Sequence, residues 1–409
     1  MPRVLVIGAG AAGTMAAIFA ATAGADTTLV ERTRDGGRKI LISGGGRCNI
    51  LPAAVDESRF VTDSSPHTLR NIVRSWPLRE QVAFFENEAG IPLVEEPASA
   101  KLFPRSNSAR DVRDRLYDLA RRRGVVFMMS AVVQGFEPLS SGWRVAIAGA
   151  GSINADAVIV ATGGLSVPAT GSDGLGLHVA RDLGHTVHAT YPALTPLTAV
   201  PAPFAELSGV SLPVSVMARS ATRSAYSRGG FLFTHVGYSG PAILDVSHVA
   251  VRARMDDDPT AVVKVQWSEY ADEQWTAALR PAGTRTVAAA VSAKLPTRLA
   301  EALIAHEGVA PRQTLAHLTR GDRIRLIDAL VRFPLPCTGD EGYKKAEVTG
   351  GGVNLGEIDP RTMESRRHPR LFLCGEMLDA FGPIGGYNFL WAWATGRAAG
   401  LGAARSVLL

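Results

Sequence analysis

The chain has 409 residues, of which 46% are hydrophobic and 20% are charged. This composition excludes a disordered or fibrous protein, and the length suits roughly two to three domains. The net charge of +5 permits a nucleic-acid partner without indicating one. The three cysteines, Cys48, Cys337 and Cys374, form no CxxC pair, which argues against a disulfide scaffold or a zinc ribbon. We expect no metal site.

Residues 4–25 carry no charge, so a signal peptide or a membrane span has to be considered. The run divides into an apolar strand at 3–7, a glycine cluster at 8–13 and an alanine-rich helix to about residue 23. A second strand at 26–30 completes a β-α-β unit. Because the glycines would weaken a spanning helix, we predict a cytoplasmic protein that does not enter a membrane.

The remaining elements indicate a discontinuous α/β domain. In chain order we predict a glycine-rich loop at 35–49, helices at 66–90 and 110–123, strands within 125–160, a small antiparallel sheet or β-barrel at about 191–266 and helices at about 268–333. Strand character returns near 346–353 and 371–374, and a helix ends the chain. These patterns predict an α/β domain formed by 1–190 and 340–409, interrupted by an inserted domain at 191–339.

The glycine cluster reads Gly8-Ala9-Gly10-Ala11-Ala12-Gly13 and stands between the first strand and the first helix. In that position Gly8 permits a tight turn, Gly10 admits a pyrophosphate close to the backbone, and Gly13 lets the helix pack on the strand. Glu31 follows the second strand and can accept hydrogen bonds from a ribose. Its charge would repel a 2′-phosphate, so NADP is not expected at this site. The motif predicts a bound dinucleotide.

Three later segments favour FAD over NAD in this site. A buried strand ends in the turn Ala161-Thr162-Gly163-Gly164, and a second strand at 371–374 ends in a carboxylate, Glu376. That carboxylate could hold the ribityl hydroxyls of FAD or act as an ordinary helix cap. Gly385-Gly386-Tyr387-Asn388 opens the last helix, whose N–H groups could face a flavin. An NAD dehydrogenase needs none of these segments.

With these motifs the sequence resembles the bacterial HI0933-like family of NAD(P)/FAD-dependent oxidoreductases. The matching segments are 6–13, 37–49, 101–112, 161–174, 232–244, 347–366 and 371–396. Members of this family have been called aminoacetone oxidases and bile-acid ene reductases, and one branch acts as a ribosomal RNA dihydrouridine synthase. The resemblance implies a two-dinucleotide-type FAD-binding Rossmann-like domain with an inserted β-barrel and helical part.

The resemblance also implies which residues bind FAD. They are Gly8, Gly10, Ala12, Gly13, Glu31, Arg32, Arg38, Lys39, Ser43, Gly44, Gly45, Arg47, Cys48, Val133, Ala161, Thr162, Gly163, Gly375, Glu376, Gly386, Tyr387 and Asn388. Phe381, Ile384 and Leu390 depart from the residues usual in the family near the flavin. These departures concern the class of substrate more than the binding of FAD.

The candidates for acid–base chemistry are Cys48, His235 and Tyr387. Cys48 follows Arg47, whose charge would lower the pKa of the thiol and prepare it to protonate a substrate carbon. The alternative is that Cys48 only fills space in a tight loop. His235 is a proton donor or a structural histidine, and Tyr238 and Tyr343 are further candidates. The adjacent Lys344 and Lys345 would meet an anionic substrate or the NADPH phosphate, or form a solvated pair.

Four functions remain open at this stage. The favoured one is NAD(P)H-driven hydride transfer through the flavin to an activated C=C bond of a small molecule. The others are reduction of a uridine in ribosomal RNA, amine oxidation by oxygen, and a protein whose FAD is purely structural. Since only one GxGxxG follows a strand, NADH or NADPH would have to dock transiently. The sequence does not indicate an oligomeric state.

Overall fold

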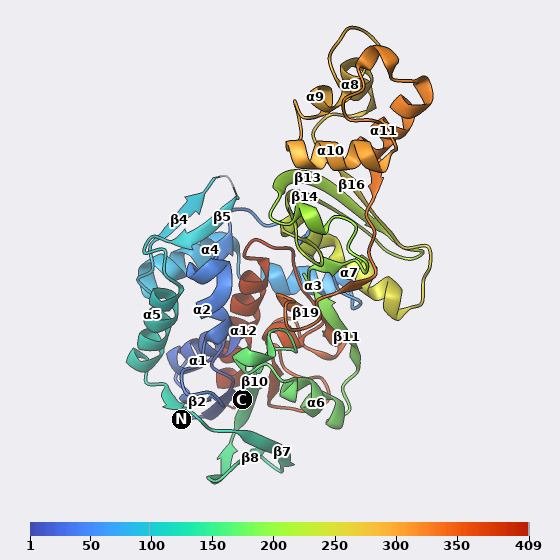
Figure 1. Ribbon diagram of the computed structural model, residues 1–409. Helices are drawn as coiled ribbons and strands as arrows, with labels where there is room; N and C mark the ends of the chain where they lie inside the picture. The colour runs from blue at the N-terminus through green and yellow to red at the C-terminus, as the bar shows by residue number, and fades with distance from the viewer. Residues whose placement is uncertain (98, 408–409) are drawn as a thin grey trace. The chain divides into compact units, whose positions relative to one another are not determined.

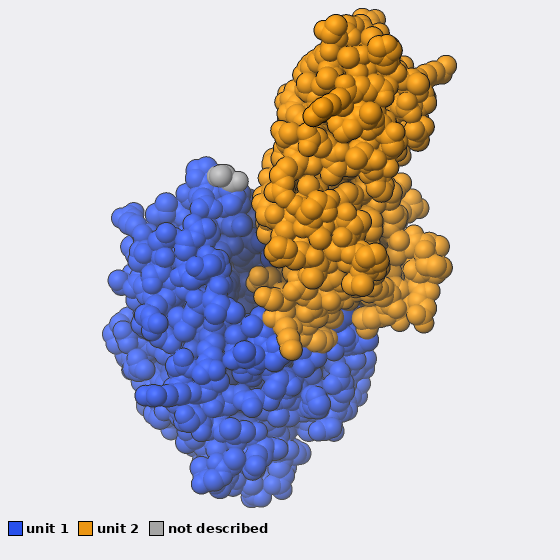
Figure 2. Space-filling model, viewed as in Figure 1, with its two compact units in different colours: residues 1–191, 348–409 blue, residues 192–347 orange. Residues whose placement is uncertain are grey.

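The computed structural model describes residues 1–97 and 99–407 and divides into two compact units. Unit 1 comprises residues 1–191 and 348–409, and unit 2 comprises residues 192–347 (Figure 2). The chain returns to unit 1 at 347/348 rather than at the expected 339/340. The reason is that strand β18 (Gly339–Asp340) pairs with strand β12 (Leu197–Thr198) inside unit 2.

Unit 1 is built on a five-stranded sheet with the strand order β20-β10-β1-β2-β6. Every pair of neighbouring strands in it is parallel. The strands are β1 (Arg3–Ile7), β2 (Asp26–Val30), β6 (Val126–Met128), β10 (Ala157–Val160) and β20 (Leu371–Leu373). Burial of β10 and β20 at every position is typical of a parallel sheet covered on both faces.

Two helices of unit 1 run side by side, α1 (Ala11–Thr22) and α12 (Tyr387–Ser406) (Figure 1). Their close approach depends on two glycines of α12. A Cβ atom on Gly396 would overlap the carbonyl oxygen of Ala12, and one on Gly400 would overlap that of Ala16. The last helix of the chain is therefore packed directly against the helix that opens the first β-α-β unit.

The other elements of unit 1 surround this centre. The helices are α2 (Arg38–Ile42), α3 (Pro66–Arg74), α4 (Leu78–Ala83), α5 (Ala109–Arg122) and α6 (Leu175–Asp182). The strands are β3 (Leu51–Pro52), β4 (Leu93–Glu96), β5 (Lys101–Pro104), β7 (Val133–Leu139), β8 (Gly142–Ile147), β9 (Gly151–Ala155), β11 (Val187–Ala193) and β19 (Val348–Val353). The last two residues of β11 already belong to unit 2. The prediction of one helix over 66–90 is wrong, because Pro77 lacks an N–H and separates α3 from α4. The predicted helix at 110–123 is confirmed as α5.

Unit 2 contains a seven-stranded sheet with the order β17-β16-β13-β14-β15-β12-β18. Besides β12 and β18, the strands are β13 (Ser211–Arg219), β14 (Ser224–Phe233), β15 (Gly237–Ser239), β16 (Val262–Gln266) and β17 (Phe333–Pro334). The pairs are antiparallel, as expected. The hydrogen-bonded order runs between two edges, β17 and β18, so the closed barrel stays a prediction.

Helix α7 (Pro241–Met255) packs on strands β13 and β14. The helical part of unit 2 consists of α8 (Asp272–Ala278), α9 (Val287–Val291), α10 (Thr297–His306) and α11 (Arg320–Arg332). Buried residues of the sheet and of these helices form one continuous hydrophobic core. Among the residues that the structure describes, no helix has both the length and the apolar character that crossing a membrane requires.

Candidate cofactor site

The turn between β1 and α1 shows why its glycines differ in role. A Cβ atom on Gly8, which has φ +103°, would lie 2.6 Å from the carbonyl oxygen of Ala161. A Cβ atom on Gly13 would overlap the carbonyl oxygen of Gly8. A Cβ atom on Gly10, in contrast, would meet no atom within 4 Å. Packing therefore requires Gly8 and Gly13, whereas Gly10 borders open space.

Helix α1 begins without any side-chain cap. Its N-cap residue is Gly10, and its first turn contains no acidic residue. Thr14 is the first residue whose N–H finds an acceptor inside the helix, the Gly10 carbonyl at 3.0 Å. The N–H groups of Ala11, Ala12 and Gly13 precede it and have no intrahelical acceptor. Free donors combined with the positive end of the helix dipole suit a diphosphate.

Glu31 stands at the carboxyl end of β2 and is only 8% exposed. Its Oε2 accepts a hydrogen bond from the Ala9 N–H at 2.8 Å. Its Oε1 accepts hydrogen bonds from the Thr33 N–H at 2.7 Å and the Thr33 hydroxyl at 2.6 Å. The carboxylate thus anchors the glycine turn, and it retains lone pairs for a ribose hydroxyl. Ribose binding by Glu31 stays a prediction.

The same turn has a partner that sequence analysis missed, Tyr117 of α5. The buried Tyr117 hydroxyl donates to the Ala9 carbonyl at 2.8 Å. Burial raises the pKa of this phenol, so the donor stays protonated. The amphipathic pattern of 110–123 indicated a helix with a buried face. The pattern did not indicate that a tyrosine on that face contacts the Ala9 carbonyl, more than a hundred residues earlier in the chain.

The glycine loop of residues 43–48 has an unusual backbone. Gly44, Gly45 and Gly46 have φ values of +56°, +68° and +87°, and a Cβ atom on Gly45 or Gly46 would meet nothing within 4 Å. Arg47, which follows them, donates from Nη1 to Glu96 Oε1 at 3.0 Å, and its guanidinium lies 4.3 Å from the Phe103 ring centroid. The charge of Arg47 is therefore directed towards Glu96.

Cys48 is fully buried and has φ +61°. Burial raises the pKa of its thiol to about 12, and a hydrogen bond with Ser43 opposes this only in part. The expectation that Arg47 lowers this pKa is wrong, because desolvation dominates and the guanidinium pairs elsewhere. The thiol is neutral at physiological pH. A catalytic role for Cys48 stays a prediction.

Four segments of unit 1 meet at the carboxylate of Glu376, shortly after β20. Lys39 Nζ donates to its Oε2 at 2.5 Å, and Ser166 Oγ donates to its Oε1 at 2.5 Å. The N–H and the hydroxyl of Thr349 both donate to Oε1 at 3.0 Å. This network fixes the orientation of Glu376 between helix α2, the turn after β10 and strand β19.

Ser166 and Thr349 of this network received no role in the sequence analysis. Both are buried, and Thr349 Oγ1 also accepts the N–H of Leu165 at 2.7 Å and of Ser166 at 3.1 Å. Gly164 is required beside them, since a Cβ atom there would overlap the Thr349 hydroxyl. Both residues lie in segments that match the family, and that match was the only available signal.

A second buried carboxylate, Asp379, holds the loop that precedes α3. Its Oδ2 accepts hydrogen bonds from the N–H of Asp63 at 2.9 Å, the N–H of Ser64 at 2.8 Å and the Ser64 hydroxyl at 2.7 Å. His188 Nε2 lies 3.7 Å from the same oxygen. The Ser64 hydroxyl also accepts the N–H of Leu355 at 3.0 Å. Asp379 therefore fastens three segments of unit 1 together.

The N-terminus of α12 resembles that of α1, with Gly386 as an N-cap that has no side-chain bond and no acidic residue in the first turn. Its side chains are already engaged. The Tyr387 hydroxyl accepts the Asp56 N–H and donates to the Ala54 carbonyl, both at 3.3 Å. The Asn388 amide donates to the carbonyl of Gly382 and accepts its N–H, both at 2.9 Å. Flavin contacts by these side chains stay predictions.

The remaining predicted residues lie in varied places. Arg32 pairs with Asp173, and Arg38 donates to Asp35 Oδ1 at 2.8 Å. The Thr162 hydroxyl accepts the Gly176 N–H at 3.0 Å. Val133 and Ala161 are buried. The Ser43 hydroxyl donates to the Ile40 carbonyl. Gly163 has φ +75°, and a Cβ atom on Gly375 would lie 2.9 Å from Ala12 Cβ. All of these belong to unit 1.

The other proton-donor candidates belong to unit 2. His235 is exposed on the turn between β14 and β15. Tyr238 is buried, and burial raises the pKa of its hydroxyl. Lys344 and Lys345 are exposed. The exposure or burial of these residues does not test whether any of them donates a proton, so their catalytic roles stay predictions.

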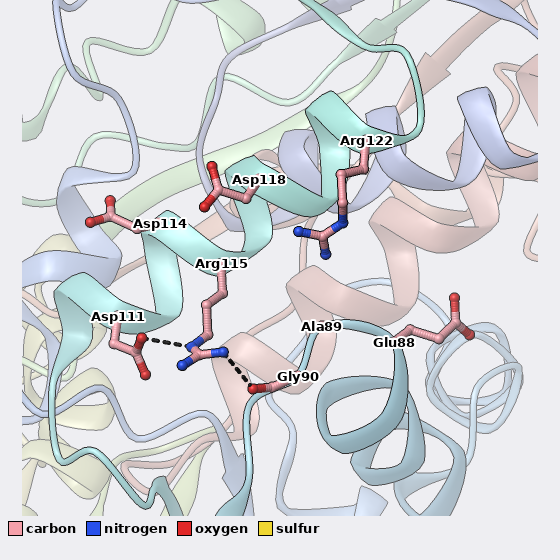
Figure 3. A pocket seen from close by; sticks show the side chains of 8 residues that line it. All are labelled: Glu88, Ala89, Gly90, Asp111, Asp114, Arg115, Asp118 and Arg122. Carbon is pink, nitrogen blue, oxygen red and sulfur yellow. Dashed lines mark hydrogen bonds and ion pairs between the residues drawn. The ribbon is translucent and has the colours of Figure 1, made fainter.

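A pocket of about 370 Å³ lies beside α5 (Figure 3). Its lining is strongly polar and consists of Glu88, Ala89, Gly90, Asp111, Asp114, Arg115, Asp118 and Arg122. Arg115 bridges it by donating to Asp111 Oδ1 at 2.6 Å and to the Gly90 carbonyl at 2.9 Å. No residue predicted to bind FAD lines this pocket, so it is separate from the candidate cofactor site.

The fold and the donor set define the class of protein. Open space at Gly10, Gly45 and Gly46, an uncapped α1 and oriented carboxylates at Glu31 and Glu376 fit an FAD. Dinucleotide-binding sites of this fold share these features, and the family to which the chain belongs narrows the class to flavin-dependent oxidoreductases. The family model described as the HI0933-like protein Rossmann domain matches residues 2–402, and the chain belongs to this family.

Two named relatives are similar to this chain over nearly its whole length, and a solved structure shares its fold. A ribosomal RNA dihydrouridine synthase of Escherichia coli is 33% identical over 96% of this chain and 95% of its own length. A 3-dehydro-bile acid delta(4,6)-reductase of Clostridium scindens is 32% identical over 99% of both chains. The crystal structure of 3-ketosteroid delta1-dehydrogenase from Sterolibacterium denitrificans shares the fold, with a TM-score of 0.54, 13% identity, and coverage of 99% of this chain and 100% of that one.

Proposed function

We propose that the protein is an FAD-dependent reductase that delivers a hydride from NADH or NADPH to an activated C=C bond. The observation that carries the proposal is the set of groups at the carboxyl ends of adjacent parallel strands. The turn at Gly8 follows β1, Glu31 follows β2, the turn at Ala161 follows β10, and Glu376 follows β20. In open α/β sheets this edge is where dinucleotides bind.

Each group at this edge has a definite task. The N–H groups of Ala11, Ala12 and Gly13 would bind the diphosphate, and Glu31 would bind the ribose of the adenosine. Lys39, paired with Glu376 at 2.5 Å, fixes the orientation of that carboxylate, which would accept hydrogen bonds from hydroxyl groups of the cofactor. The N-terminus of α12 stabilises negative charge near its first turn. When bound, FAD supplies the capacity to accept and donate a hydride.

Reduction is favoured over oxidation with oxygen by the names of the relatives. A delta(4,6)-reductase and a dihydrouridine synthase both add hydrogen across a C=C bond conjugated to a carbonyl group. Such a bond accepts a hydride at one carbon and a proton at the other. A reductase of this kind needs a source of electrons, and NADH or NADPH, which a cytoplasmic location would supply, is the donor that we propose.

A second candidate function is reduction of a uridine in ribosomal RNA. Relatives with that printed function come from two organisms, Escherichia coli at 33% identity and Haemophilus influenzae at 30% identity, each aligned over at least 96% of this chain. The C5–C6 bond of uracil has the same enone-like character as the bond in a steroid enone. The chemistry at the flavin would be shared, and only the partner would differ.

The test follows flavin absorbance in anaerobic mixtures of the purified holoprotein with NADH and with NADPH. We expect bleaching by one of them, followed by recovery of colour when a steroid enone or a uridine-containing RNA is added. Recovery only with oxygen, accompanied by hydrogen peroxide, would make the protein an oxidase and overturn the proposal. Mass spectrometry of ribosomal RNA from a strain lacking the protein tests the second candidate through loss of a dihydrouridine.

A further inference from the structure

The sheet of unit 2 has one face that α7 covers and one that it does not. The Ser227 hydroxyl of β14 donates to Asp245 Oδ2 of α7 at 2.9 Å, so this position of β14 faces the helix. Side chains alternate along a strand, and the neighbouring Tyr226 and Arg228 therefore point away from α7. The alternating burial of β13 agrees, because Val216 and Ala218 are buried while Met217 and Arg219 are exposed.

The strand register places particular side chains together on this uncovered face. Met217 of β13 stands opposite Tyr226 of β14 and opposite Lys264 of β16, which forms one row across three strands. Arg228 belongs to the next row, opposite Ser215. Tyr226 is 67% exposed, and its hydroxyl donates to Ser215 Oγ at 3.1 Å. An aromatic side chain is therefore exposed on this face, with cations in its own row and in the next.

The charge of this face has one sign. Strands β13, β14 and β16 contain Arg219, Arg228 and Lys264 and no aspartate or glutamate. None of these three cations forms an ion pair with any residue of the described chain. Arg223, on the turn between β13 and β14, does have an acidic partner, because it donates to Asp256 Oδ2 at 2.7 Å. The uncovered face therefore offers free positive charge around an exposed ring.

We propose that this face, defined by Arg219, Tyr226, Arg228 and Lys264, binds single-stranded RNA. Cations that lack acidic partners suit phosphates, and an open tyrosine ring suits stacking of an unpaired base. A duplex would keep its bases stacked on one another and could not use the ring. The hydroxyl of Ser215 in this face can bond a ribose 2′-hydroxyl, which favours RNA over DNA. The inference concerns binding alone and does not rest on the redox chemistry proposed above.

A second copy of this chain is a poorer occupant of the same face. Two such faces brought together would place like charges opposite one another, and only Met217 and Tyr226 offer large exposed apolar surface in the three strands. An acidic protein segment would neutralise the cations but would not require the ring. The contribution of the Tyr226 ring therefore distinguishes RNA from an acidic segment, and the oligomeric state distinguishes RNA from a second copy.

The experiment measures fluorescence anisotropy of a short labelled oligouridylate titrated with the FAD-loaded protein. Tyr226→Ser should weaken binding by about 5- to 150-fold, the range that corresponds to loss of one base stack. Tyr226→Phe keeps the ring and should bind like the unchanged protein. Arg228→Gln should lower the slope of log affinity against log salt by about 0.7, because one phosphate contact is lost.

Arg312→Gln is the matched control, since Arg312 is an exposed arginine of unit 2 outside the sheet. It should leave the slope unchanged, and unaltered flavin content and melting temperature should show that every variant is folded. Absence of binding, or unchanged binding by both Tyr226→Ser and Arg228→Gln, would overturn the proposal. Equal affinity for the deoxy oligonucleotide would overturn the assignment to RNA. Dimerisation abolished by Tyr226→Ser without any RNA binding would identify a second copy as the occupant.

Discussion

The two halves of the candidate cofactor site are built by different physical means. The amino-terminal half, the turn of residues 8–13 with Glu31, depends on backbone approaching backbone, as between Gly13 and the Gly8 carbonyl. The carboxyl-terminal half, residues 375–388, is held by side-chain hydrogen bonds. Glu376 and Asp379 each accept bonds from segments more than a hundred residues away.

This difference determines how each half should respond to change. Close backbone contact leaves no room for an added atom, so a substitution there fails by overlap. Substitution of a hydrogen-bonded carboxylate destabilises the protein in a different way, because it leaves several buried donors without an acceptor. We therefore expect any substitution of a packed glycine in the first half to destabilise the protein strongly. In the second half, we expect the loss of stability to grow with the number of hydrogen bonds that a substitution removes.

The largest effect is expected for Gly13→Ala. The added methyl group would overlap the Gly8 carbonyl oxygen and approach Ala161 Cβ at 3.2 Å. Neither neighbour can move without shifting β1 or β10, so we expect a loss of more than about 3 kcal/mol in the free energy of unfolding. Urea denaturation of the apoprotein measures it. A loss below about 1 kcal/mol would mean that the turn is more adaptable than backbone packing allows.

Asp379→Ala should have the next largest effect, about 2–4 kcal/mol, because three donors of residues 63 and 64 lose a buried carboxylate. The loss should be local first. Hydrogen exchange should increase at the amides of Asp63 and Ser64 before the sheet opens. The exposed Asp182→Ala is the matched control, expected to change stability by less than about 0.5 kcal/mol. Unchanged exchange at these two amides would contradict the fastening role of Asp379.

Gly10→Ala separates cofactor binding from folding within the amino-terminal half. Gly10 has φ −80°, which alanine adopts readily, and a Cβ atom there meets nothing within 4 Å. Apoprotein stability should therefore change by less than about 1 kcal/mol. The methyl group would occupy space beside the free N–H groups of α1, and FAD affinity should fall about 10- to 150-fold. Isothermal titration of apoprotein with FAD measures it. Unchanged affinity would show that the diphosphate does not bind at this helix.

The contrast also explains what the sequence could predict. The first β-α-β unit and Glu31 were predictable, because strand, glycine turn and helix lie within about thirty residues and each has its own pattern. The discontinuous unit 1 was predictable because strand character returns near residues 346–353 and 371–374. The partners of Glu376 were not, since Lys39, Ser166 and Thr349 meet only after the chain has folded. The prediction that Arg47 lowers the pKa of the Cys48 thiol was wrong for the same reason. The neighbour of Arg47 in sequence is Cys48, but its partner in space is Glu96.

Acid should weaken the carboxyl-terminal segment around Glu357 in two stages. His185 is buried with its Nδ1 3.1 Å from Glu357 Oε2, and desolvation lowers its pKa from the ordinary 6.5. The unfolded chain then binds the proton more readily, so stability falls as pH drops below about 6.5. Hydrogen bonds from Arg367 chiefly, and from Thr186, lower the pKa of Glu357 to about 2, so its contribution is lost between pH 4.5 and 2.

Unfolding free energies measured between about pH 7 and pH 5 test the first stage. His185→Gln should flatten the pH dependence, while His178→Gln, at an exposed histidine, should leave it as it was. An identical slope in all three proteins would show that His185 does not remain neutral in the folded state.

The smallest effect is expected for Cys48→Ala. Cys48 lies between the two halves of the site in chain order, and its raised pKa of about 12 reflects a desolvated thiol rather than an activated one. Loss of one buried sulfur should cost about 1 kcal/mol of stability and leave FAD bound.

If the thiol only packs, both redox half-reactions of Cys48→Ala should keep the rates of the unchanged protein in stopped-flow traces. A proton donor would behave differently. Flavin reduction by NADH or NADPH would stay normal, while reoxidation by the acceptor would slow by about 10²–10⁴, the usual contribution of a general acid. Alkylation by iodoacetamide gives an independent check, because a buried neutral thiol should react in the native protein far more slowly than in urea. Fast native alkylation at Cys48 would show that the glycine loop opens, and it would restore the thiol as a candidate for chemistry.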